Sequence, residues 1–103
     1  MRKIADAESA LNFGENDIAL AELGDRTICL ARFRGGLYAF PRQCPHAGGP
    51  LNEGWIDAQG NVACPVHGYK FGLQTGRHPA DGGYLLKRWR VEKREDGIYV
   101  DLP

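Results

Sequence analysis

Two short fragments, CPHAGG at positions 44–49 and CPVHGYKF at positions 64–71, constrain this chain more than any other part of its sequence. Each fragment holds one cysteine and one histidine among prolines and glycines, which interrupt helices and strands and favour tight loops. The whole chain has only three cysteines and three histidines, so the two fragments hold four of these six residues. The fold must therefore present two thiols and two imidazoles from two loops.

The length and composition of the chain indicate one globular domain, residues 1–103. Hydrophobic residues make up 43% and charged residues 25% of the sequence, which is ordinary for a folded soluble domain. The 13 basic and 13 acidic residues cancel, so no basic field is present to hold a phosphate backbone. The apolar runs are only a few residues long, far short of the ~20 needed to cross a bilayer. We therefore expect neither a nucleic-acid partner nor a membrane.

The N-terminal segment MRKIADAESAL has basic residues but no continuous apolar stretch behind them, so it is not typical of a secretory signal. A cytoplasmic location is the expectation that follows. In a reducing compartment cysteines bind metals or react rather than pair, and three is an odd number for a disulfide framework. A fold held together by disulfides is therefore disfavoured.

Most of the chain outside the two fragments has the pattern of short β-strands. Residues 18–23 and 26–33 are rich in apolar and β-branched side chains. Helical periodicity is limited to one or two turns within residues 6–13, where Asp6 or Ser9 could act as the cap. We therefore expect an all-β domain of antiparallel hairpins. The turn signals that predict these hairpins are Gly24-Asp25, Gly35-Gly36, Gln59-Gly60 and Asp96-Gly97.

Three chemistries could use the pattern C-x-H, residues 47–63, C-x-x-H. Structural zinc sites usually group two cysteines in one loop and two histidines on one helix, and Pro65 and Gly68 prevent a helix after Cys64. A cysteine beside a histidine can act as a nucleophile, but this does not explain why the pair occurs twice with prolines in matching places. A [2Fe–2S] cluster with two cysteines on one iron and two histidines on the other explains the duplication, since each loop gives one ligand to each iron.

The stretch CPHAGGPL…CPVHGYKF resembles the signature of Rieske iron–sulfur proteins, C-x-H followed by C-x-x-H, together with its neighbouring residues. The longer stretch from CPHAGGPLNEGWID to NVACPVHGYKFGLQTGR is similar to the cluster-binding half of Rieske-type ferredoxins and of the small subunit of NAD(P)H-dependent nitrite reductases. The resemblance implies a Rieske-type fold of antiparallel β-sheets, in which a basal β-sandwich carries a loop-rich cluster-binding subdomain at about residues 41–83.

The resemblance also implies one [2Fe–2S] cluster per chain and assigns its ligands. Cys44 and Cys64 are expected to bind the inner iron, and His46 and His67 the outer, more exposed iron. Electrons enter and leave at the histidine side in this family. Replacing two thiolates by neutral imidazoles makes such a cluster less negative, and therefore easier to reduce.

Four positions around the ligands depart from the high-potential respiratory members of the family. Those proteins carry a disulfide between the two loops, at the positions of Gly49 and Val66, so this brace cannot form here. They also have serine and tyrosine hydroxyls that donate to the cluster and its ligand, at the positions of Tyr69 and Phe71. Because donors to sulfur stabilise the reduced state, their loss predicts a midpoint potential of roughly −150 mV rather than near +300 mV.

The resemblance implies an electron carrier rather than an enzyme, and we expect no catalytic residues. The carrier would pass one electron at a time from a flavin reductase to a terminal oxygenase, typically one that hydroxylates aromatic rings. The alternative that stays open is a fixed accessory subunit of an assimilatory nitrite reductase, bound to the large subunit. A zinc-binding interaction module is a more distant alternative.

A few further residues have expected places near the two loops. Cys29 lies mid-strand and is expected to be a small buried hydrophobe. His78 is expected on a surface loop that flanks the cluster, and Trp55 as an anchor in the core or an interface. Pro50 and Leu51 are expected to form an exposed apolar rim on which redox partners dock.

Overall fold

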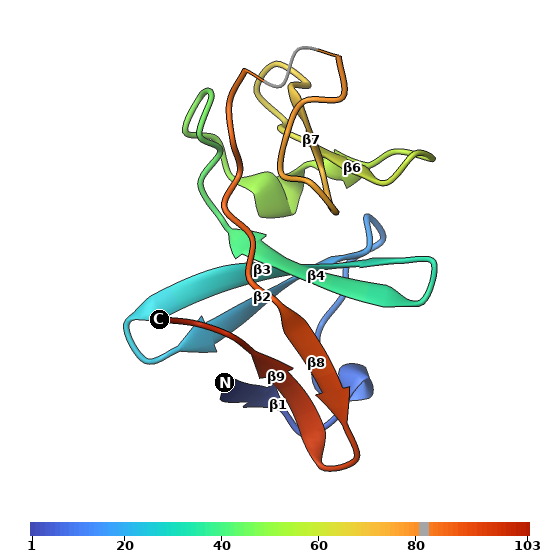
Figure 1. Ribbon diagram of the computed structural model, residues 1–103, viewed down its shortest axis with the longest axis vertical. Helices are drawn as coiled ribbons and strands as arrows, with labels where there is room; N and C mark the ends of the chain where they lie inside the picture. The colour runs from blue at the N-terminus through green and yellow to red at the C-terminus, as the bar shows by residue number, and fades with distance from the viewer. Residues whose placement is uncertain (81–82) are drawn as a thin grey trace.

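The computed structural model describes residues 1–80 and 83–103, and in this part the chain forms nine strands in three antiparallel sheets (Figure 1). The strand orders are β1-β9-β8, β2-β3-β4 and β5-β6-β7. The only helical segments in the same residues are two 3-10 turns, and none is long and apolar enough to cross a membrane. The predicted all-β fold is confirmed. The elements are β1 Arg2–Ala5, η1 Glu8–Ala10, β2 Ile18–Leu23, β3 Arg26–Phe33, β4 Gly36–Pro41, η2 Leu51–Glu53, β5 Trp55–Ile56, β6 Asn61–Ala63, β7 Lys70–Gly72, β8 Val91–Arg94 and β9 Gly97–Val100.

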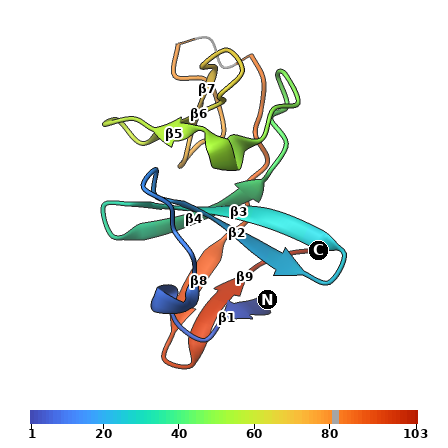
Figure 2. The ribbon, with the colours of Figure 1, turned by 180° about the vertical axis from the view of Figure 1, so that it is seen from behind.

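The three sheets follow one another along the long axis of the molecule, which measures 39 × 28 × 21 Å (Figures 1 and 2). The β2-β3-β4 sheet lies in the middle, and the β1-β9-β8 sheet covers it on one side. The β5-β6-β7 sheet lies on the other side, with the loops that hold the cysteines and histidines at the far end. The expected basal sandwich and loop-rich second part are therefore both present.

Strand β3 is where the two hydrophobic cores of the molecule meet. Its residues 28–31 are all fully buried, because successive side chains of a strand point to opposite faces and both faces are covered. Cys29 and Ala31 belong to the core shared with β6 and β7, whereas Ile28 and Leu30 belong to the core shared with β9. Cover on both faces explains why this strand has a continuous apolar run instead of alternating polar and apolar residues.

The hairpin turns around β3 are made by residues with positive φ. Gly24 has φ 67° and lies in the β2–β3 turn at the predicted place. The β3–β4 turn consists of Arg34 and Gly35, with φ of 49° and 81°. Two positive φ values suit the twist of a two-residue hairpin, so the turn lies one residue earlier than predicted and Gly36 begins β4.

Two expectations near the chain ends need correction. The β8–β9 turn is Glu95-Asp96, because Gly97 already belongs to β9. The predicted helical turn exists as η1, but neither Asp6 nor Ser9 caps it. Its N-cap residue is Ala7, which makes no side-chain cap bond, since backbone hydrogen bonds alone close this short 3-10 turn.

The β5–β6 hairpin turns around Gln59-Gly60 as predicted, and Asp57 holds it together. Its Oδ1 accepts hydrogen bonds from the backbone N–H groups of Gln59 and Asn61, both at 3.0 Å. Its Oδ2 lies 2.9 Å from Nζ of Lys70 in β7. Burial raises the pKa of Asp57, but the N–H of Asn61 and the ammonium of Lys70 outweigh this effect and lower its pKa to about 2. One carboxylate therefore links β6 and β7 to the turn after β5.

Candidate metal centre

The first fragment forms a tight loop between β4 and η2. The backbone N–H of Cys44 donates to the carbonyl of Gly49 at 2.9 Å, and the N–H of Gly48 donates to the carbonyl of Cys44 at 2.8 Å. Gly48 has φ 73°, a left-handed conformation that glycine adopts without strain. The loop therefore projects the side chains of Cys44 and His46 from a fixed backbone.

The second fragment, between β6 and β7, repeats this loop with equivalent hydrogen bonds. The N–H of Cys64 donates to the carbonyl of Tyr69 at 2.9 Å, and the N–H of Gly68 donates to the carbonyl of Cys64 at 2.8 Å. Gly68 has φ 72°. The glycine four residues after each cysteine is thus required by the loop backbone. The histidine occupies the second place after the cysteine in one loop and the third in the other.

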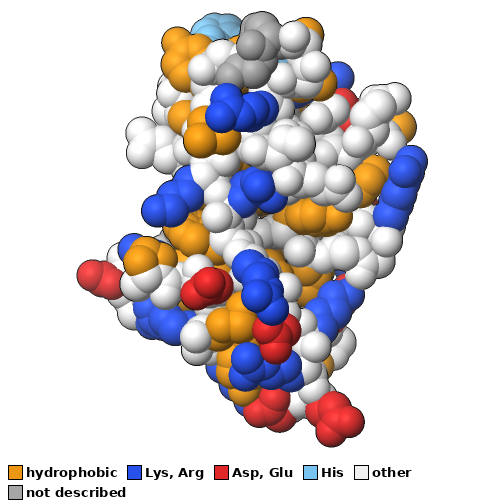
Figure 3. Space-filling view, viewed as in Figure 1, with side chains coloured by type: hydrophobic (Ala, Val, Ile, Leu, Met, Phe, Trp, Pro, Cys, Tyr) orange, Lys and Arg blue, Asp and Glu red, His pale blue; other side chains and the backbone are white. Residues whose placement is uncertain are grey.

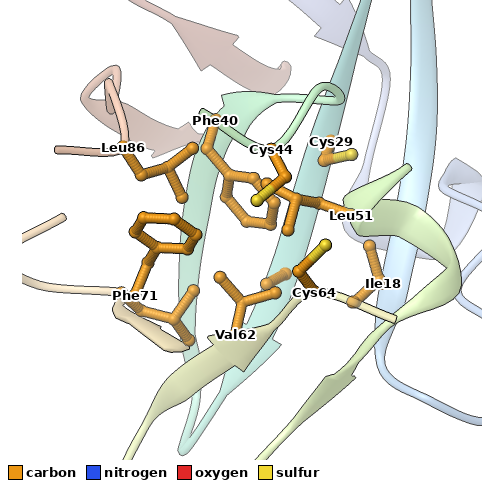
Figure 4. Packing of buried hydrophobic residues seen from close by; sticks show 11 residues of the cluster. Ile18, Cys29, Phe40, Cys44, Leu51, Val62, Cys64, Phe71 and Leu86 are labelled. Atoms are coloured by element: carbon orange, nitrogen blue, oxygen red, sulfur yellow. The ribbon is translucent and has the colours of Figure 1, made fainter. Parts of the chain in front are cut away.

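The two loops bring the thiols of Cys44 and Cys64 together in the hydrophobic core. Both residues are buried, and Figure 4 shows them in the region occupied by Phe40, Leu51 and Val62. Burial raises the pKa of the Cys44 thiol, and the neighbouring Cys64 thiol adds to the rise, while backbone N–H groups of its own loop lower it. The loop therefore already supplies the N–H donors that a metal-bound thiolate would use.

The two histidines lie outside the thiols, at the end of the molecule, where Figure 3 shows His side chains beside hydrophobic ones. His46 is half-buried and His67 is exposed, with ring centroids 5.9 Å apart and ring planes at 76°. The Nδ1 atom of His46 is buried and has no hydrogen-bond partner among the described residues. An unsatisfied buried nitrogen costs about 1–3 kcal/mol, and a metal ion at this point would satisfy it.

This donor set fits a two-iron cluster. Within residues 1–80 and 83–103, no group of three or more His, Cys, Asp or Glu side chains is placed to hold a single metal ion. A tetrahedral zinc site needs four ligands about one ion, whereas a [2Fe–2S] cluster needs only two protein ligands at each iron. Gly49 lets the first loop approach the sulfur closely, because a Cβ at this position would lie only 3.0 Å from Sγ of Cys64.

Aromatic rings pack around His46, and most of these contacts were not foreseen from the sequence. The Tyr69 ring stacks on the His46 ring, with centroids 4.5 Å apart and planes at 12°. The Tyr84 ring meets His46 edge-on at 5.0 Å, and the His78 ring lies 4.7 Å from Tyr69. His78 therefore flanks the site, as expected for its loop. Tyr84 carries no motif, so only the fold reveals its place.

The expectation that Leu51 forms an exposed rim is wrong. Leu51 is fully buried, because it begins the 3-10 turn η2 after Pro50 and its side chain packs between the two cysteines and Phe40 (Figure 4). Among the described residues of this half of the molecule, the exposed large apolar side chains are instead Trp55, Val66, Tyr84 and Leu85.

The structure also places Cys29 and Trp55, the two remaining candidates. Cys29 is fully buried in the same hydrophobic core as the thiol pair, and burial raises the pKa of its thiol to about 12, as expected for an inert residue. Trp55 is 46% exposed, and its ring lies 3.8 Å from the place of a Cβ on Gly68. It is therefore a surface residue beside the second loop and not a core anchor.

Comparison with known sequences identifies relatives along most of the chain. The model of the Rieske [2Fe-2S] domain matches residues 3–81. Apoptosis-inducing factor 3 of Homo sapiens is 34% identical over 80 residues, which are 77% of this chain but only 13% of that protein. The 3-phenylpropionate/cinnamic acid dioxygenase ferredoxin subunit of Escherichia coli (strain K12) is 32% identical over 79 residues, 74% of this chain and 73% of the subunit.

Solved structures agree with the fold. A chain from the complex of reduced oxygenase and oxidized ferredoxin in carbazole 1,9a-dioxygenase superposes with a TM-score of 0.75 and 26% identity, over 96% of this chain and 90% of that one. The ferredoxin of Sphingomonas yanoikuyae B1 has a TM-score of 0.78 at 19% identity, over 99% and 100% of the two chains. A candidate NADPH nitrite reductase small subunit has the same TM-score at 21% identity, with the same coverage. The last two likenesses concern the fold alone.

Proposed function

The chain belongs to the Rieske [2Fe-2S] domain family, and on that premise we propose that it carries single electrons from a flavin reductase to a terminal ring-hydroxylating oxygenase. The observation that supports this proposal most is the buried Nδ1 of His46, which has no hydrogen-bond partner among the described residues and belongs to the same loop as one of the two buried thiols. Ferredoxin subunits of a dioxygenase are among the relatives that align over three quarters of their length, and they support the oxygenase as the acceptor.

We assign the ligands in two pairs. Cys44 and Cys64 would bind the inner iron through their thiolates, and His46 and His67 would bind the outer iron, the first of them through Nδ1. The pairing is supported by the contact between the thiols inside the core and by the two imidazoles outside them. When bound, such a cluster supplies reversible one-electron chemistry.

The position of the histidines suits a carrier. The thiols are buried under the loops, whereas His67 is exposed at the end of the molecule, so a partner can approach the outer iron closely there. The charged side chains Asp and Glu gather at the opposite end in Figure 3.

We see the segment at about residues 41–83 as the cluster-binding part of a single domain, with positions 81 and 82 outside the described residues.

A cytoplasmic location goes with this function. Its support is that two of the three cysteines are assigned as iron ligands and the third, Cys29, is fully buried, so the chain needs no oxidising compartment to form a disulfide. The alternative role as the small subunit of a nitrite reductase uses the same site and the same cluster, and it differs only in the partner.

The decisive experiment is to purify the chain with iron and sulfide and to measure its absorption, its metal content and the EPR spectrum of the reduced protein. We expect two irons per chain and a Rieske-type signal that is lost in Cys64→Ser and kept in Cys29→Ala, where the buried thiol is not a ligand. The reduced chain should then donate to a ring-hydroxylating oxygenase. A colourless chain with stoichiometric zinc would refute the cluster assignment. Stable association with a large nitrite reductase subunit would favour the accessory-subunit role over the oxygenase as electron acceptor.

A further inference from the structure

The two histidines of the site have very different surroundings. The His46 ring is half-buried, stacked face to face with Tyr69 and touched edge-on by Tyr84. The His67 ring is exposed, and the one ring contact recorded for it in the described part of the chain is with His46 at 5.9 Å. The His46 imidazole is therefore packed against another ring, whereas the His67 imidazole is exposed to solvent.

Tyr69 reaches His46 across the gap between the two loops. Its backbone belongs to the second loop, where its carbonyl accepts the N–H of Cys64, but its ring lies on a residue of the first loop. The ring is in turn supported from the core by the fully buried Phe71, with centroids 5.0 Å apart. The Tyr69 hydroxyl also accepts the backbone N–H of Tyr84 at 3.4 Å. Tyr69 is thus anchored from several sides, and His46 rests on it.

We propose that Tyr69 is a positioning residue for His46 and that it makes the two imidazole ligands unequal. This inference rests on the proposed cluster. The stacked phenol ring and the edge-on Tyr84 ring hold the plane of the His46 imidazole, in which its buried Nδ1 lies. The hydroxyl accepts the backbone N–H of Tyr84, and this bond is separate from the stacking of the ring on His46. His46 is the fixed and shielded ligand, and His67 is the ligand through which a partner receives the electron.

Two substitutions separate the effect of the Tyr69 ring on His46 from the effect of the Tyr69 hydroxyl. Tyr69→Phe keeps the stacked ring, and Tyr69→Leu removes it while leaving a smaller apolar side chain. Leu85→Ala is the matched control, because Leu85 is 55% exposed in the same half of the molecule and has no ring to support His46. The readout is pulsed EPR of the reduced protein with ¹⁵N-labelled histidine, which resolves the nitrogen couplings of the two ligands separately.

We expect Tyr69→Leu to change one of the two nitrogen couplings and leave the other unchanged, with cluster loss to a chelator at least threefold faster. Tyr69→Phe and Leu85→Ala should match the wild-type chain in both measurements. Unchanged couplings in Tyr69→Leu, equal changes in both, or equal effects of Leu and Phe would each overturn the proposal.

A second non-aromatic variant, Tyr69→Met, covers the case in which the leucine does not fit. If Leu and Met variants both fail to fold by circular dichroism, Tyr69 is a core residue and the positioning role is overturned. If they fold but do not retain the cluster while Tyr69→Phe does, the role is upheld. Absence of any Rieske signal in the wild-type chain would instead refute the proposed function, so the two failures are distinguishable.

Discussion

The side chain of Val66 fills the space that a side chain at position 49 would need. A Cβ placed on Gly49 would lie 2.5 Å from Cγ2 of Val66 and 3.6 Å from its Cβ. The two loops thus touch face to face at these residues, next to Sγ of Cys64. These are the positions at which the resemblance places the disulfide of the respiratory proteins, and here a glycine and a valine fill the same contact without a covalent link.

This contact predicts that the double variant G49C/V66C forms a disulfide under oxidising conditions. Replacing Val66 removes the clashing Cγ2, and the remaining Cβ–Cβ distance of 3.6 Å is within the range of disulfides. A link that closes a loop of this length stabilises a fold by about 3 kcal/mol. Intact-mass analysis should show the loss of two hydrogens, and the melting temperature should rise and fall back on reduction.

Single variants test the geometry behind this prediction. Gly49→Ala alone should destabilise the protein, because its Cβ meets Val66, and G49A/V66A should recover part of the loss. A double cysteine variant that stays fully reduced in oxidant, with its cluster intact, would contradict the contact.

The hairpins and the backbone of the two loops could be predicted from the sequence because their signals are local. Gly24 marks a turn through its own conformational freedom, and Gly48 and Gly68 mark the same place in two similar loops. The one-residue shift to Arg34-Gly35 has a different origin. Either Arg34-Gly35 or Gly35-Gly36 could make the turn, and the register between β3 and β4 decides between them.

The surroundings of the ligands could not be predicted in this way, because they are contacts between distant segments. Tyr84 and His46 are far apart in the sequence, and their rings meet because the chain after β7 passes the loop that holds His46. Leu51 shows the same limit, since a leucine after a proline has no local mark that separates a rim residue from a core residue. The 3-10 turn η2 decides that it faces inward.

The exposed Val66 should be a docking residue in place of Leu51. Val66 is 49% exposed next to His67, so Val66→Asp adds a charge to the surface beside this histidine. We expect the electron-transfer rate to the partner to fall about tenfold, equivalent to about 1.4 kcal/mol, with an unchanged cluster spectrum. Stopped-flow oxidation of the reduced chain by its partner measures this rate.

Two matched variants check that the effect is local. Leu20→Asp alters a residue that is similarly exposed, at 40%, but lies in the basal strand β2, so it should leave the rate unchanged. Leu51→Asp buries a carboxylate in the core and should cost several kcal/mol of stability. Equal rates for Val66→Asp and the wild type would exclude this face from docking.

Asp57 should make the stability of the β5-β6-β7 sheet depend on pH in the acidic range. Its pKa is lowered in the folded state to about 2, so its contribution is fully present above its ordinary value near 4 and is lost as the pH falls toward 2. Asp57→Asn should therefore lower stability by about 1–2 kcal/mol at pH 7, which is several degrees in melting temperature. The difference from the wild type should shrink steadily below pH 4, and a constant difference from pH 7 to pH 2.5 would contradict the assignment.

The midpoint potential should lie near the low end of the Rieske range, at roughly −150 mV. Phe71 has no hydroxyl and is fully buried, and the Tyr69 ring lies on His46, so its hydroxyl points to the backbone of Tyr84. Without a hydroxyl at position 71 the extra negative charge of the reduced cluster is stabilised less, and reduction becomes harder. Spectroelectrochemical titration measures the potential directly. Phe71→Tyr should raise it only if the new hydroxyl reaches a sulfur, and a wild-type value above about +100 mV would show that other donors replace the missing ones.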